Sequence, residues 1–133
     1  MIARKMREFG FDKYESYEFA PNRLNSWGML KGTGGGCSLL LQAHVDTVGI
    51  EGWKERWKGT LKEDPFSGAL IDGEIWGRGS IDCKAGMAAS LIACKALKEA
   101  GVLSLAPLIL ILAVSATWLW FNQDLAALTI DSM

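Results

Sequence analysis

Histidine, cysteine and proline are scarce in this sequence. Its 133 residues include one histidine, His44, three prolines and three cysteines, with no CxxC spacing among Cys37, Cys83 and Cys94. An odd number of cysteines without close pairs is not typical of a disulfide framework. We therefore expect a protein of a reducing compartment, the cytoplasm.

A strong excess of either charge is also missing. The formal net charge is −1 and 22% of the residues are charged, which fits a globular domain and gives no reason to expect a nucleic-acid partner. Residues 1–19 carry charges throughout and lack the apolar core of a secretory signal peptide. We expect one domain of ordinary size.

One long stretch, residues 102–121, contains no charge at all. Its length suits a membrane-spanning helix, with Trp118 and Trp120 at the bilayer interface, and the chain would then be a membrane-anchored, non-catalytic protein. The alternative is a buried strand over 108–114. We favour the strand, because a helix packed on a sheet requires an apolar strand after it, although this does not explain the continuation through "WLWF".

The order of the remaining patterns indicates an α/β fold. "SLLLQAHV" is typical of a buried strand, Asp72–Gly73 predicts a hairpin turn, and an amphipathic helix over 85–100 precedes the strand at 108–114. Strand, loop, helix and strand in this order predict a mostly parallel sheet with flanking helices. In such sheets ligands bind beyond the carboxyl ends of strands, where His44–Asp46 and Ser80–Asp82 are both expected.

His44 and Asp46 alternate in "HVD", so on a strand their side chains share a face. A carboxylate beside a histidine can hold one ring N–H while the other nitrogen binds a metal. It can equally orient a catalytic histidine of the Ser-His-Asp kind. A histidine at a strand end that bonds only to solvent or backbone is the third interpretation.

Asp82 lies in the glycine-rich stretch "GRGSIDCKAG", just before the predicted helix. It suits a metal ligand on a loop that approaches closely, or a simple acid at a helix N-terminus. Arg78 and Lys84 flank it, either to lower its pKa or as solvated charges. The neighbouring Cys83 is a candidate zinc ligand or nucleophile, but a partly buried structural thiol fits better.

Taken together, these motifs closely resemble one enzyme family. "AHVDTV", then "DPFSG", then "DGEIWGRGSIDCKAGMAA" and an amphipathic helix, spread over about residues 25–116, resemble the co-catalytic zinc metallopeptidases of the acetylornithine deacetylase, succinyl-diaminopimelate desuccinylase and carboxypeptidase type. The resemblance implies hydrolysis of amide bonds in N-acyl amino acids or small peptides. It also implies two zinc ions, with cobalt or manganese as substitutes.

The resemblance implies a role for each site residue. His44 matches the first zinc ligand, Asp46 matches the catalytic-site carboxylate that supports this histidine, and Asp82 matches the aspartate that bridges the two metals. In the family a pair of glutamates follows the strand equivalent to 108–114, and a second histidine comes later. This chain has neither a Glu-Glu pair nor a second histidine.

These departures lead to three expectations. Residues 1–133 form part of a catalytic domain with an atypical tail at 117–133, produced by truncation or a shifted reading frame. The chain alone is weakly active or inactive, because a catalytic zinc takes three protein ligands. A sheet without its later strands exposes an edge, so we expect self-association.

Overall fold

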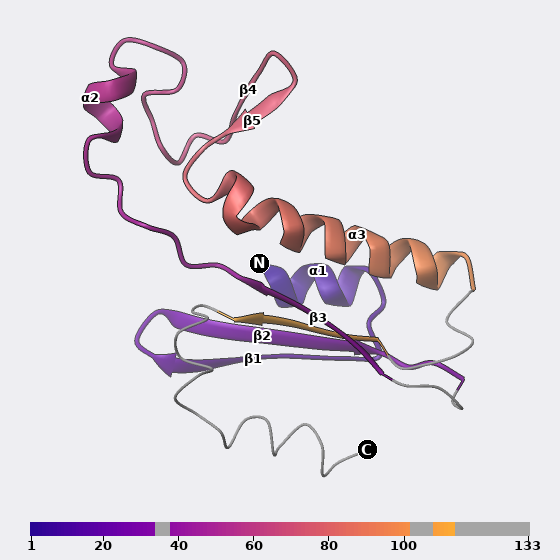
Figure 1. Ribbon diagram of the computed structural model, residues 1–133. Helices are drawn as coiled ribbons and strands as arrows, with labels where there is room; N and C mark the ends of the chain where they lie inside the picture. Colours follow the sequence, from indigo (N-terminus) through magenta and orange to yellow (C-terminus); the bar gives the residue numbers. More distant parts are fainter. Residues whose placement is uncertain (34–37, 102–107, 114–133) are drawn as a thin grey trace.

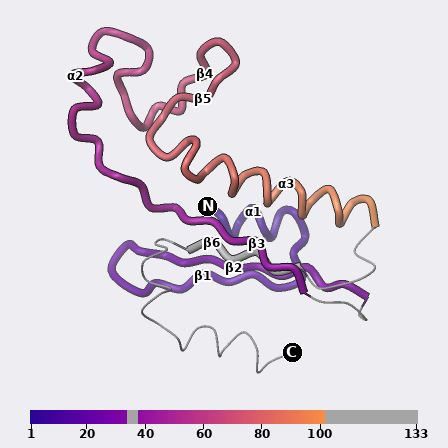
Figure 2. Tube along the Cα trace, viewed as in Figure 1, coloured from indigo at the N-terminus to yellow at the C-terminus, as the bar shows by residue number. Residues whose placement is uncertain are grey.

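The computed structural model describes residues 1–33, 38–101 and 108–113. A four-stranded sheet forms its main body, and the strand order is β1 (Lys13–Ala20), β2 (Arg23–Leu30), β6 (Leu108–Ala113) and β3 (Leu39–His44). Figure 1 shows α1 (Ile2–Glu8) and α3 (Gly86–Glu99) on the same side of this sheet. Beyond the start of α3 lie α2 (Trp53–Trp57) and a hairpin of β4 (Ala69–Ile71) and β5 (Glu74–Trp76) (Figure 2).

The prediction of a mostly parallel sheet is wrong. β1 pairs antiparallel with β2, and β2 pairs antiparallel with β6, while β3 and β6 are parallel. Between β1 and β2 the chain reverses through Pro21 and Asn22, with Asn22 at a φ of 60°. A connection this short joins only antiparallel strands. The fold therefore combines helices with a mixed sheet.

The parallel pair and its crossover helix agree with the sequence. α3 and β6 fall within the predicted helix and strand, and β6 pairs with β3 in a register that joins Leu39 to Leu108 and His44 to Ala113. A strand paired on both sides rules out a membrane helix over 108–113. The rest of 102–121 and the tail at 117–133 lie outside the described residues. Within the described ranges, no helix is long and apolar enough to cross a bilayer.

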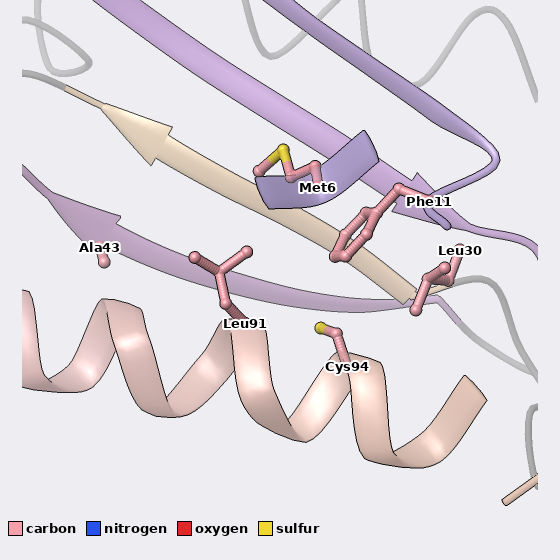
Figure 3. Close-up of a cluster of buried hydrophobic side chains, with 6 residues drawn as sticks. All are labelled: Met6, Phe11, Leu30, Ala43, Leu91 and Cys94. Carbon is pink, nitrogen blue, oxygen red and sulfur yellow. The ribbon is translucent and has the colours of Figure 1, made fainter. Parts of the chain in front are cut away.

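A small apolar core joins the two helices to the sheet. Figure 3 shows side chains from α1, α3 and the strands pointing toward one another. The chain also needs Gly28 here, because a Cβ at this position would lie 2.8 Å from the Met6 sulfur and 2.8 Å from the Phe11 ring. Burial raises the pKa of the Cys94 thiol, which therefore stays protonated. The core residues are Met6, Phe11, Leu30, Ala43, Leu91 and Cys94.

The hairpin beyond α3 has the predicted turn. Asp72 and Gly73 have φ angles of 51° and 82°, as a tight turn with two left-handed residues requires. The hairpin stands apart from the main sheet, and its last strand leads directly toward Asp82.

Candidate metal centre

The carboxyl end of β3 presents the imidazole of His44 between two carboxylates. Nδ1 lies 3.1 Å from the backbone oxygen of Asp46 and 3.2 Å from its Oδ1, while Nε2 lies 2.9 Å from Oδ1 of Asp82. The His44 side chain is 29% exposed and Asp82 is 79% exposed. The three residues singled out in the sequence are thus brought together.

Asp82 reaches His44 by a route that the sequence did not predict. It was expected at the end of a strand of the same sheet, but β5 belongs to the separate hairpin. Asp82 instead lies in the kinked segment Ser80–Ala85, where its φ and ψ of −119° and 98° are not helical. Asp82 is also the acidic residue in the first turn of this segment, so its place near a helix N-terminus and its contact with His44 occur together.

The hydrogen bonds around His44 determine what its ring can bind. Both groups near Nδ1 are acceptors, so Nδ1 carries a proton and a neutral ring presents the lone pair of Nε2 to Asp82. A lone pair 2.9 Å from an anionic oxygen is stable only with a proton or a metal cation between them. Partial burial lowers the pKa of His44, but the hydrogen bonds to Asp46 and Asp82 outweigh it and raise this pKa above its ordinary value.

The spacing of the two donor atoms also suits a metal. Zinc binds histidine nitrogen and carboxylate oxygen at about 2.0–2.2 Å, so two ligands at a tetrahedral angle lie about 3.3 Å apart. The observed separation of Nε2 and Oδ1 is 2.9 Å, and a slight rotation of the exposed Asp82 side chain opens it. The donor pair therefore fits zinc, and it fits other divalent ions that accept nitrogen and oxygen.

Cys83 belongs to the same group of potential ligands, since the donor atoms of His44, Asp82 and Cys83 lie within 4.8 Å of one another. Its sulfur accepts a hydrogen bond from the His44 backbone nitrogen at 3.2 Å and donates one to the His44 carbonyl at 3.3 Å. A thiol that donates its proton is not the thiolate that metals bind. Cys83 thus fastens the end of β3 to the loop, as expected of a structural thiol.

A cavity of about 430 Å³ opens beside His44 and Asp82. The sequence did not single out two of its aromatic walls, Trp53 and Trp76, and it left the role of Arg78 open. Arg78 packs over the Trp53 ring, with its guanidinium carbon 4.7 Å from the ring centroid. Trp53 follows His44 by nine residues, whereas Trp76 and Arg78 follow it by 32 and 34, so the fold of the loop brings them to one cavity. The cavity is lined by His44, Asp46, Thr47, Val48, Trp53, Trp76, Gly77, Arg78, Gly79, Ser80, Ile81 and Asp82.

The chain belongs to peptidase family M20/M25/M40, whose model matches residues 40–115, more than half of the sequence. This match covers β3 from Leu40 onward, the cavity loop, α3 and β6. It confirms the resemblance drawn from "AHVDTV" and "DGEIWGRGSIDCKAGMAA". Membership supports metal-dependent amide hydrolysis at the level of the family.

Individual relatives agree with the family. N-formyl-4-amino-5-aminomethyl-2-methylpyrimidine deformylase of Bacillus subtilis (strain 168) is 38% identical over 105 residues, which are 76% of this chain and 23% of the relative. Succinyl-diaminopimelate desuccinylase of Wigglesworthia glossinidia brevipalpis is 42% identical over 98 residues, which are 71% of this chain and 23% of the relative. The chain thus spans about 23% of the length of these curated relatives.

The fold has a solved counterpart. The crystal structure of human carnosine dipeptidase 1 matches with a TM-score of 0.57 and 20% identity, over 86% of this chain and 25% of that one. At this identity the match shows the fold alone. It is consistent with the mixed arrangement of helices and strands seen here.

Proposed function

We propose that this chain carries part of the metal centre of a hydrolase that cleaves amide bonds in N-acyl amino acids or small peptides. His44 Nε2 and the Asp82 carboxylate are the metal ligands, and zinc is the expected ion, with cobalt or manganese as substitutes. The observation that carries the proposal is the His44 ring held between two carboxylates. The names of the relatives, a deformylase and a desuccinylase, describe removal of acyl groups.

The residues of the chain divide the work at this site. Asp46 accepts the Nδ1 proton of His44, which fixes the ring orientation and makes Nε2 a stronger ligand. Asp82 adds the negative charge that a divalent ion requires, and Cys83 holds the strand end in place. A bound zinc ion supplies Lewis acidity, which activates water and polarises an amide carbonyl.

The described residues supply two of the three protein ligands that a catalytic zinc normally takes, so we propose that the chain alone hydrolyses its substrate weakly. Hydrolysis of N-acetylated amino acids by the purified chain, with and without added zinc, measures this. We expect slow turnover that depends on the metal. Turnover above about 1 s⁻¹, the low end of ordinary enzymes, would contradict the expected weakness.

Zinc binding tests the site directly. We expect His44→Ala to weaken zinc binding at least about tenfold in equilibrium dialysis, since it removes one of two ligands and leaves Asp82 alone. Asp72→Asn, which removes a carboxylate from the distant hairpin turn, is the matched control and is expected to bind zinc as the parent chain does. Equal affinity of the His44→Ala variant and the parent would reject the proposed site.

A further inference from the structure

We propose that Arg78 is a specificity residue of this site and binds a carboxylate group of the substrate. The inference rests on the proposed function, because it takes the cavity beside His44 and Asp82 as the substrate site. It deepens that function by naming the side chain that recognises the acidic part of the molecule. A cavity of about 430 Å³ is of the size that holds a small molecule.

Arg78 is held firmly on its backbone. Its N–H donates to the carbonyl of the fully buried Pro65 at 2.6 Å, and its own carbonyl accepts a hydrogen bond from Lys84 Nζ at 2.8 Å. These contacts tie it to the segment before the hairpin and to the segment after Asp82. Arg78 therefore enters the cavity from a fixed position.

The guanidinium group is oriented as well. It lies over the ring of Trp53, and the Trp53 indole N–H in turn donates to the backbone oxygen of Lys62 at 2.8 Å. A stacked arginine keeps its planar set of donors in one direction, so it loses little freedom when it binds a planar carboxylate. This is a preorganised binding group.

The head group of Arg78 has an unsatisfied donor. Its Nε is buried and has no hydrogen-bond partner among the described residues. Within the same ranges no carboxylate forms an ion pair with Arg78, and the two aspartates of the cavity, Asp46 and Asp82, both bond to His44. A buried donor without a partner costs free energy. A carboxylate in the cavity would pair with the terminal N–H groups of the guanidinium, and a small rotation of the side chain would let Nε–H donate to it as well.

The other charges of the cavity favour a carboxylate over a phosphate. Arginine recognises both groups through the same planar donors. The cavity, however, contains one arginine and two aspartates, Asp46 and Asp82. A phosphate dianion would be repelled by these aspartates more strongly than a singly charged carboxylate, and Arg78 alone would not compensate for two charges.

Arg56 provides a natural comparison. It also packs over a tryptophan, with its guanidinium carbon 5.2 Å from the centroid of the Trp57 ring, but it does not line the cavity. A general effect of removing a stacked arginine should therefore appear in both Arg56 and Arg78 variants. Carboxylate recognition should appear at Arg78 alone.

The test is an NMR titration of the metal-free, ¹⁵N-labelled chain with N-acetylglycine and with its neutral analogue N-acetylglycinamide. We expect N-acetylglycine to shift the Nε–H signal of Arg78 and to bind about tenfold more tightly than the amide, the factor to which about 1.4 kcal/mol corresponds. This preference should vanish in Arg78→Gln and persist in Arg56→Gln. Equal affinity for both ligands in the parent chain, or a preference retained in Arg78→Gln, would overturn the proposal.

A second measurement needs no variant. Phenylglyoxal modifies arginine side chains, and mass spectrometry locates the modified residue. N-acetylglycine should protect Arg78 from modification and leave Arg56 as reactive as before, whereas equal modification of Arg78 with and without the ligand rejects the proposal. Tighter binding of inorganic phosphate than of N-acetylglycine at Arg78 would reject the carboxylate assignment.

Both measurements use protein without metal, so the role of Arg78 and the metal centre can be rejected independently of each other. Zinc binding that depends on His44, together with no carboxylate preference, would reject the role of Arg78 alone. Carboxylate preference without zinc binding at His44 would reject the metal centre and leave the role of Arg78 standing.

Discussion

The imidazole of His44 is restrained at both nitrogens, and the two restraints differ in kind. At Nδ1 it meets two oxygens of the same residue, Asp46, one from the backbone and one from the side chain. At Nε2 it meets Asp82, which arrives from a segment 38 residues away. Local sequence therefore sets the ring orientation, whereas the fold supplies the second metal ligand.

Asp46→Asn tests the contribution of the first carboxylate. Asparagine keeps the size of the side chain and an acceptor oxygen but removes the charge that makes Nε2 a better ligand. We expect zinc affinity to fall about tenfold, the lower end of the range for such supporting residues, because the backbone oxygen still accepts the Nδ1 proton. Isothermal titration with zinc measures the change. A loss of more than about a hundredfold, beyond the range for supporting residues, would indicate that Asp46 binds the metal itself.

The sequence predicted much of this site and missed its remainder for physical reasons. "HVD" places two side chains on one face of a strand by alternation alone, and the family resemblance added Asp82. Arg78 and Trp53 could not be placed, because their contact depends on Pro65, Lys62 and Lys84, which converge only in the folded loop. Periodicity carries no information about such contacts.

Among the elements, the segment from Gly77 to Asp82 determines the shape of the cavity. Gly79 has a φ of 77°, and a Cβ at this position would lie 2.4 Å from the methyl group of Thr47. The loop can therefore rest against the segment after β3 only with glycine here. Asp82 follows three residues later, so its distance from His44 depends on this packing.

Gly79→Ala should destabilise the protein and weaken zinc binding. Gly73→Ala is the matched control, because Gly73 also has a positive φ, 82°, but a Cβ there meets nothing within 4 Å. We expect a loss of about 1–2 kcal/mol from the left-handed backbone in both variants, and about 1–3 kcal/mol more from the clash in Gly79→Ala alone. Urea unfolding measures the free energy, and zinc affinity should fall only in Gly79→Ala.

Removing the methyl group that clashes completes this test. In the Thr47→Ser background Gly79→Ala should cost about as much as Gly73→Ala, because the methyl group that the new Cβ overlaps is gone and the remaining close atoms, Nζ and Cε of Lys84 at 3.2 and 3.3 Å, are the flexible end of a side chain. If Gly79→Ala lowers the free energy of unfolding equally in the parent chain and in the Thr47→Ser variant, the packing of Gly79 against Thr47 does not shape the loop.

The elements themselves were easier to predict than their pairing. The amphipathic stripe and the Asp72–Gly73 turn identified α3 and the hairpin within a residue or two, because each depends on neighbours in sequence. The antiparallel pairing of β2 with β6 joins strands about eighty residues apart, and an apolar strand looks the same whichever direction its neighbour runs.

At the scale of the molecule, the main sheet of the described residues has β3 at one edge. In the part of the chain that the structure describes, β3 pairs with β6 alone, and its Leu39 and Leu40 are 54% and 53% exposed. Unpaired backbone groups beside exposed leucines favour pairing with another chain. Self-association through this edge remains a proposal.

Leu40→Lys tests the edge. A charge at this position should raise the concentration needed for self-association about tenfold, equivalent to about 1.4 kcal/mol. Leu61→Lys, which changes a leucine that is 77% exposed in the loop before the hairpin, should leave association unchanged. Sedimentation velocity over a concentration series distinguishes the two. A parent chain that stays monomeric throughout would contradict the proposal.

The contact between His44 and the segment at Asp82 and Cys83 has a topological consequence. It closes residues 45–81 into one long loop, which contains α2, the hairpin, Trp53 and Arg78. The entropic cost of closing such a loop rises only slowly with its length. Insertions in parts of the loop that do not line the cavity should therefore be tolerated well. A change that weakens the contacts of His44 with Asp82 and Cys83 should instead loosen the whole loop.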